Sequence, residues 1–169
     1  MTRKQYLTRT EIAKMDGENK VHFLNPQARR RNKSLGYAAG LVALGVHLIE
    51  IPIGSTASEF HYHLYEEECL FILDGSGVAR IGEAVYQVEA GDFIGYPAGE
   101  EPHDLRNTGA GLLRCLVVGQ RLPFDVATYP EKGKRLYRMA GQPWDMADIT
   151  AIEHPAPRGR RWPARLGVQ

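Results

Sequence analysis

Between residues 41 and 119, short apolar stretches alternate with turn residues, and almost none has the spacing of an amphipathic helix. In residues 84–90, alternate positions suit one wet and one dry face of a sheet. Stretches of this kind at regular intervals predict antiparallel strands rather than alternating strands and helices. The all-β fold class that fits eight such strands is a double-sheet jelly roll. The eight stretches are 41–51, 59–65, 66–73, 77–82, 84–90, 92–97, 103–108 and 112–119.

The segments on either side lack this pattern. Thr8 precedes Glu11 by three residues, as in a capping box, and Gly17 follows, so one short helix is expected there. We expect residues 1–40 to form an otherwise irregular N-terminal arm and residues 41–120 to form the barrel. Residues 121–169 are expected to be an irregular C-terminal extension that packs on the barrel or on a second subunit. The arginine-rich C-terminal residues are expected to be flexible.

Charge and composition narrow the class of partner. The 169 residues fit one domain, and 21 basic against 20 acidic side chains give a formal charge of +1. This balance favours a small-molecule partner over nucleic acid or an anionic membrane. The basic run at residues 29–33 is a candidate phosphate or nucleic-acid contact, but such a cluster is more often a solvated face or an intersubunit contact.

Targeting and cysteine signals are weak. No apolar stretch approaches the roughly 20 residues of a membrane helix, and the N-terminus lacks the apolar core of a signal peptide, so a cytoplasmic location is expected. Cys69 and Cys115 each lie in an apolar, strand-like stretch. Packing is a commoner role there than a disulfide or a catalytic thiol.

The stretch from Glu59 to Gly75, EFHYHLYEEECLFILDG, carries the clearest chemistry. Side chains two apart in a strand share a face, so His61 and His63 can direct their imidazoles to one point. That pair alone would more often be two hydrogen-bonded core histidines. Three glutamates follow, and a second stretch, GDFIGYPAGEEPHDLRN at residues 91–107, contains His103.

Together these stretches resemble the paired sequence motifs of the cupin superfamily, and the motifs span residues 54–107, about a third of the chain. Six residues separate Gly54 from His61 where five are usual, and three separate Gly99 from His103 where two are usual. The positions that match the motifs are Gly54, His61, His63, Glu68, Gly75, Gly91, Pro97, Gly99, His103 and Asn107.

The resemblance implies a cupin barrel, or double-stranded β-helix, with His61, His63, Glu68 and His103 as metal ligands. Glu67 competes with Glu68, but it misses the motif spacing to Gly75 and its side chain points to the other face of the strand. Three imidazoles and a carboxylate suit one divalent transition metal ion, whether Fe, Mn, Ni, Co, Cu or Zn. Four such ligands leave coordination positions open for water or substrate.

Candidate catalytic residues follow from strand alternation. His47 shares a face with two isoleucines and is a candidate general base or substrate ligand, although a satisfied core histidine is the commoner case. Tyr96 and Tyr62 are candidate acids or hydrogen-bond donors, although aromatic residues in strands usually pack.

Two functional hypotheses follow. The first is a metal-dependent enzyme acting on a small organic molecule, in which dioxygenase, isomerase and lyase chemistry are not separated. The second is a non-catalytic small-molecule or metal-binding protein, such as a sensor. The sequence is also similar to a group of small bacterial single-domain cupins, and this similarity implies the fold but no reaction. By analogy with cupins of this size, we expect a homodimer.

Overall fold

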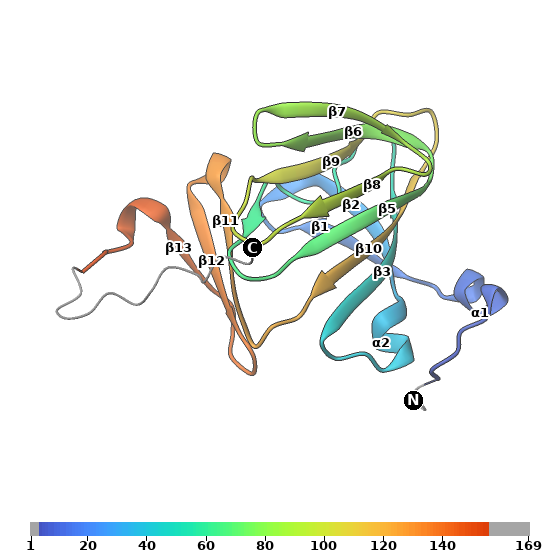
Figure 1. Cartoon of the computed structure of the whole chain (residues 1–169), viewed down its shortest axis with the longest axis horizontal. Helices are drawn as coiled ribbons and strands as arrows, with labels where there is room; N and C mark the ends of the chain where they lie inside the picture. The colour runs from blue at the N-terminus through green and yellow to red at the C-terminus, as the bar shows by residue number, and fades with distance from the viewer. Residues whose placement is uncertain (1–3, 156–169) are drawn as a thin grey trace, which may run out of the picture.

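The computed structural model describes residues 4–155, and the arginine-rich C-terminal residues lie outside this range. Three antiparallel sheets account for most of the described chain, as Figure 1 shows. The all-β class is therefore confirmed, and the arrangement is consistent with a jelly-roll barrel. No helix within this range has the length and apolarity needed to cross a membrane.

The largest sheet has six strands in the order β1-β2-β3-β10-β5-β8. Its centre comes from stretches that the alternation predicted, and its edge includes a hairpin from the N-terminal segment. The bounds are β1 (Glu18–His22), β2 (Asn25–Ser34), β3 (Leu44–Ile51), β10 (Leu113–Gln120), β5 (Glu68–Asp74) and β8 (Phe93–Tyr96).

A three-stranded sheet, β7-β6-β9, lies across from the large one (Figure 1). It consists of β6 (Ser76–Ile81), β7 (Ala84–Glu89) and β9 (His103–Asn107). The glycine-rich residues 74–77 join β5 to β6, but these two strands lie in different sheets. Gly75 has a φ of 87°, and a Cβ atom added to it would lie 2.6 Å from the carbonyl oxygen of Leu112. The chain therefore makes a corner here that only glycine fits.

One hydrophobic core lies between these two sheets. Its buried members come from β3, β5, β6, β7, β8, β9 and β10. Alternate positions on three of these strands are buried, namely Ile49 and Ile51, Leu70 and Ile72, and Leu105. Cys115 belongs to this core, and both Cys69 and Cys115 are free.

The third sheet, β13-β12-β11-β4, connects the C-terminal segment to the motif histidines. On β4 (Tyr62–His63), His63 pairs with Ala127 of β11 (Phe124–Tyr129). The sheet continues through β12 (Lys134–Met139) to β13 (Asp145–Asp148), with short 3₁₀ turns at Pro130–Lys132 and Ile149–Ala151. The C-terminal extension is thus more regular than its sequence indicated, and it forms one side of the site.

The N-terminal segment is also more regular than expected. The short helix α1 (Arg9–Lys14) is present, and Thr8 and Glu11 form the predicted capping box. The β1–β2 hairpin and a second short helix, α2 (Leu35–Ala39), follow. Lys33 on β2 donates to the carbonyl oxygens of Ile12 and Ala13, which attaches the helix to the sheet. The basic run is therefore part of a sheet.

Candidate metal centre

His61 and His63 face each other at the barrel mouth, with their Nε2 atoms 3.2 Å apart. His61 Nδ1 lies 2.7 Å from the carbonyl oxygen of Glu59, and His63 Nδ1 lies 2.6 Å from Asp125 Oδ2. Both partners are acceptors, so each Nδ1 carries the hydrogen, and in the neutral ring each Nε2 presents a lone pair. Two facing lone pairs repel unless a metal ion or a proton lies between them. Burial opposes protonation of His63, but the hydrogen bond and charge of Asp125 outweigh it and raise the pKa of His63.

The spacing of these nitrogens suits a metal ion. Zinc–imidazole bonds are about 2.0–2.1 Å long, so two nitrogens at octahedral to tetrahedral angles lie about 2.8–3.4 Å apart. The observed 3.2 Å lies within that range. Burial and the neighbouring histidines hold the pKa of His61 well below its usual value, which keeps the lone pair available.

His103 provides a third imidazole beside this pair. It bridges to His61 through the backbone, and the two ring centroids are 4.9 Å apart. Its Nδ1 faces the carbonyl oxygen of Glu101 at 3.4 Å, whereas its Nε2 is buried without a hydrogen-bond partner. Burial lowers the pKa of His103 to about 4, so this Nε2 also presents a lone pair near neutral pH. Buried nitrogens of this kind are rare without a function, and a metal ligand role fits.

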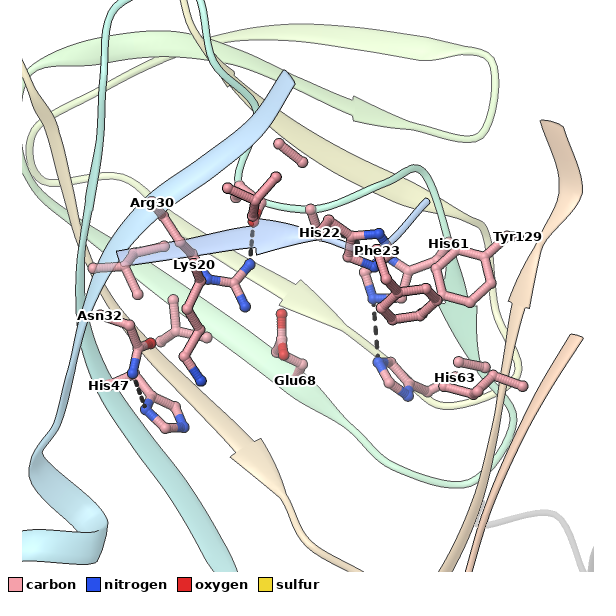
Figure 2. A pocket seen from close by; sticks show the side chains of 18 of the residues that line it. Lys20, His22, Phe23, Arg30, Asn32, His47, His61, His63, Glu68 and Tyr129 are labelled. Carbon is pink, nitrogen blue, oxygen red and sulfur yellow. Dashed lines mark hydrogen bonds between the residues drawn. The ribbon is translucent and has the colours of Figure 1, made fainter. Parts of the chain in front are cut away.

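Glu68 enters the same cavity from β5. Figure 2 shows its carboxylate between Arg30 on one side and His63 on the other. Burial raises the pKa of Glu68, and the positive charges of His63 and Arg30 act against that rise. A donor set of three imidazole nitrogens and one carboxylate would suit a divalent transition metal, and Glu68 is the carboxylate that the motifs imply for it.

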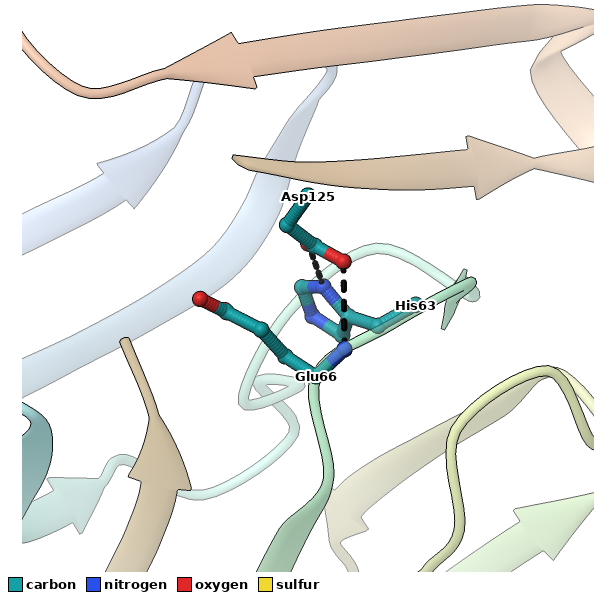
Figure 3. A group of neighbouring side chains, drawn as sticks. All are labelled: His63, Glu66 and Asp125. Atoms are coloured by element: carbon teal, nitrogen blue, oxygen red, sulfur yellow. Dashed lines mark hydrogen bonds and ion pairs between the residues drawn. The ribbon is translucent and has the colours of Figure 1, made fainter. Parts of the chain in front are cut away.

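A tighter group of ligand atoms lies next to these residues. Within residues 4–155, the ligand atoms of His63, Glu66 and Asp125 all lie within 4.8 Å of one another (Figure 3). Among the described residues, the ligand atoms of the four residues implied by the motifs do not all lie within that distance of one another. The His61 ring lies between the other two imidazoles, with its centroid 5.0 Å from that of His63 and 4.9 Å from that of His103.

The contacts of Glu66 and Asp125 favour a supporting role over direct metal binding. Arg138 forms an ion pair with Glu66 and lies 3.9 Å from Asp125. Glu66 also accepts from the backbone N–H of Leu122, and Asp125 accepts from two backbone N–H groups, those of Tyr65 and Glu66. These carboxylates are already balanced by donors, and Arg138 would repel a cation placed between them.

The effect of this cluster is to orient His63. Burial alone would raise the pKa of Asp125, but the hydrogen bond and charge of His63 and the two N–H groups hold that pKa below its usual value. An ionised Asp125 then fixes the tautomer and direction of the His63 ring, as carboxylates do beside many metal-binding histidines.

The site opens into a cavity of about 390 Å³. Its walls come from β1 and β2, from β3, β5 and β10, and from the C-terminal sheet. Arg30, Lys20, His22 and Tyr129 line it. The sequence had raised Arg30 only as one member of the basic run, and it had not singled out the other three as site residues. A cavity of this size accommodates a small organic molecule.

Two of the candidate catalytic residues, His47 and Tyr96, occupy different places. His47 lines the cavity, with its ring nitrogens 3.2 Å from the Asn32 amide and 3.3 Å from the Arg121 guanidinium. Burial and the Arg121 charge lower its pKa to about 4. Tyr96 does not line this cavity. Its ring stacks on His103 at 3.6 Å, and its hydroxyl is buried without a partner, so in this structure it packs behind a histidine.

Comparison with known proteins agrees with this geometry. A family model described as a cupin domain matches residues 47–119. A solved structure from Acidithiobacillus ferrooxidans is 46% identical over 92% of this chain and 99% of its own, with a TM-score of 0.88. The chain belongs to the cupin superfamily. The name of that Acidithiobacillus cupin marks it as a candidate sugar phosphate isomerase.

A second similar cupin comes from Silicibacter pomeroyi and is named a sugar phosphate isomerase. It is 26% identical over 83% of this chain and 90% of its own, with a TM-score of 0.72. No match was found among curated proteins.

Proposed function

We propose that this cupin is a metal-dependent isomerase of a phosphorylated sugar. The observation that supports metal binding is the facing pair of Nε2 atoms on His61 and His63, in which each ring already donates its Nδ1 hydrogen to another acceptor. The isomerase class is supported by the names of the two similar cupins. Of the dioxygenase, isomerase and lyase chemistries that the sequence left open, this is the one we propose.

Each site residue has a stated part in this proposal. His61, His63 and His103 hold the ion through Nε2, and Glu68 adds the carboxylate. A divalent ion bound there supplies Lewis-acid polarisation of a substrate carbonyl. Asp125 and the carbonyl oxygen of Glu59 keep two of the rings in the tautomer that binds metal.

His47 is the candidate proton carrier outside the ligand set. Its lowered pKa, about 4, leaves it neutral near pH 7, but the same lowering makes it a weak base. Both of its nitrogens are within hydrogen-bond distance of Asn32 and Arg121, so substrate must displace one of these neighbours first. Tyr96 supports His103 by ring stacking in this scheme.

The engagement of His47 favours a second candidate function, a non-catalytic small-molecule binder or sensor. If neither neighbour of His47 is displaced, the cavity can hold a ligand without transferring a proton. The two functions differ in one observable, since a binder shifts stability on ligand addition but does not interconvert aldose and ketose.

The test combines metal analysis with an isomerase assay. Purified protein should carry about one divalent ion per chain and interconvert aldose and ketose phosphates, and a chelator should abolish this activity. The double variant His61→Ala/His63→Ala should lose at least ten-fold in bound metal and all measurable activity.

His154→Ala is the matched control, because His154 is exposed and lies outside the cavity lining. It should keep both metal and activity. Unchanged metal content in the double variant would sink the proposal, and metal binding without turnover of any sugar phosphate would select the binder instead.

A further inference from the structure

Two cationic side chains face each other across the N-terminal hairpin. Lys20 of β1 and Arg30 of β2 are direct cross-strand partners, and both line the cavity. Residues directly opposite in an antiparallel pair have Cβ atoms about 4.5–5.5 Å apart, and like charges there are destabilising. Holding two positive charges together at the cavity wall therefore lowers the stability of this hairpin.

The alternation along β2 shows that Arg30 is directed inward. Ala28, Arg30 and Asn32 line the cavity, whereas Arg29 and Arg31 are exposed. Arg31 donates to the carbonyl oxygen of Asp16, and Arg29 donates to that of Pro26. The basic run is thus split between structural contacts on the outside and one guanidinium inside.

The inward guanidinium has unused donor capacity. Arg30 Nη1 donates to the carbonyl oxygen of Ala57, but Nε is buried with no hydrogen-bond partner. A guanidinium has five N–H donors and no acceptor, so a buried donor without a partner is costly. Glu68 is the acidic side chain whose charge acts most on Arg30, and the metal proposal assigns Glu68 to the ion.

Lys20 adds charge at the rim of the cavity. Its ammonium lies 3.2 Å from Glu18 in an exposed ion pair, and such pairs are weak enough to exchange for a better acceptor. The charges of Lys20 and Arg30 also contribute to the lowered pKa of His47 across the cavity. This wall therefore carries two cations, with Glu18 beside Lys20 and Glu68 as the carboxylate that acts on Arg30.

We propose that Arg30 and Lys20 form the anion subsite of the cavity and bind the phosphate group of the substrate. This inference rests on the proposed function in one respect, that the substrate is phosphorylated. In Figure 2, Glu68 lies between these two side chains and His63, so the anion end and the metal end of a bound molecule are on opposite sides of that carboxylate.

The chemistry of the subsite favours phosphate over a carboxylate. Arginine provides a planar fork of donors that matches phosphate oxygens, and lysine adds a point charge. Two cations balance a phosphate dianion, whereas a carboxylate would leave one positive charge uncompensated. The Asn32 amide, on the same face of β2, offers a neutral donor beside them.

The experiment measures binding of inorganic phosphate to the full chain by titration calorimetry. Arg30→Gln and Lys20→Gln should each weaken phosphate binding at least ten-fold. Arg29→Gln is the matched control on the same strand, with the same loss of charge from an exposed side chain, and it should bind phosphate like the wild type. Arg30→Lys keeps the charge without the fork and should fall between wild type and Arg30→Gln.

A parallel titration of His61→Ala/His63→Ala separates this subsite from the metal centre. If the double variant retains phosphate binding and Arg30→Gln loses it, the subsite is supported even if the proposed isomerase activity fails. If the double variant loses phosphate binding and Arg30→Gln retains it, the subsite is overturned, because the metal ion would then bind the phosphate. Metal content and thermal unfolding midpoint of Arg30→Gln must match the wild type, and if they do not, Lys20→Gln decides.

Two further ligands test the chemical class. A hexose phosphate should bind at least ten-fold more tightly than the free hexose, and Arg30→Gln should remove that advantage. Acetate should bind at least ten-fold more weakly than phosphate. Equal binding of acetate, or no advantage of the sugar phosphate over the sugar, contradicts the proposal.

Discussion

Hydrogen bonds at Nδ1 decide what the motif histidines can bind. Spacing in the sequence was enough to predict that His61 and His63 share a face, and the structure confirms this with a 3.2 Å approach of their Nε2 atoms. Spacing could not identify Asp125, which lies 62 residues beyond His63 and meets it through the C-terminal sheet. The basic run at residues 29–33 was a candidate phosphate contact, but the sequence could not show that Arg30 is directed inward, because that depends on how β2 pairs.

Asp125→Asn tests this orientation of His63. Loss of the carboxylate charge weakens the hold on the His63 tautomer, so metal affinity should fall about 10–100-fold, as it does for other carboxylates behind metal-binding histidines. Competition with a chromophoric chelator measures the affinity. Asp148→Asn is the control, because Asp148, on β13, is exposed and pairs only with Lys134 among the described ion pairs. Equal affinities in the two variants would show that Asp125 does not orient a metal ligand.

The alternation of apolar and polar residues predicted the central strands, but it missed the outer ones. The eight predicted stretches correspond to β3 to β10, with β5, β6 and β10 each extending one residue further, because apolar and polar residues alternate where one face is buried. β2 has an alternation of a different kind, in which exposed arginines flank an inward arginine, so hydrophobicity alone misses it. β11 is buried at nearly every position and therefore shows no alternation.

The turn at Gly75 between β5 and β6 gives a prediction about the stability of these two strands. Gly75→Ala adds a Cβ atom 2.6 Å from the Leu112 carbonyl oxygen, at a φ of 87°. The left-handed conformation alone costs about 1–2 kcal/mol, and the close contact adds about 1–3 kcal/mol.

Gly54→Ala is the matched control, because Gly54 has a φ of 77° and no atom within 4 Å of an added Cβ. Urea unfolding of both variants, metal-loaded in the same way, gives the comparison. Gly75→Ala should be the less stable of the two, and equal losses would mean that the corner tolerates a side chain.

At the scale of the whole molecule, the N-terminal hairpin, the barrel and the C-terminal sheet all contribute to one cavity. Family resemblance predicted the barrel and its ligands, but the anion wall and the support for His63 come from the segments outside the motifs. The homodimer stays a prediction. Phe71 and Phe93, which are exposed cross-strand partners on β5 and β8, provide one apolar patch on the outer face of the large sheet.

The central claim is that the ion binds between the Nε2 atoms of His61, His63 and His103. Anomalous diffraction from crystals of the metal-loaded protein locates the ion directly, at the absorption edge of the element found by elemental analysis. We predict one peak within about 2.0–2.4 Å of those three nitrogens, the range of metal–nitrogen bonds. A peak among His63 Nδ1, Glu66 and Asp125, or no peak in protein that carries metal in solution, would contradict the account.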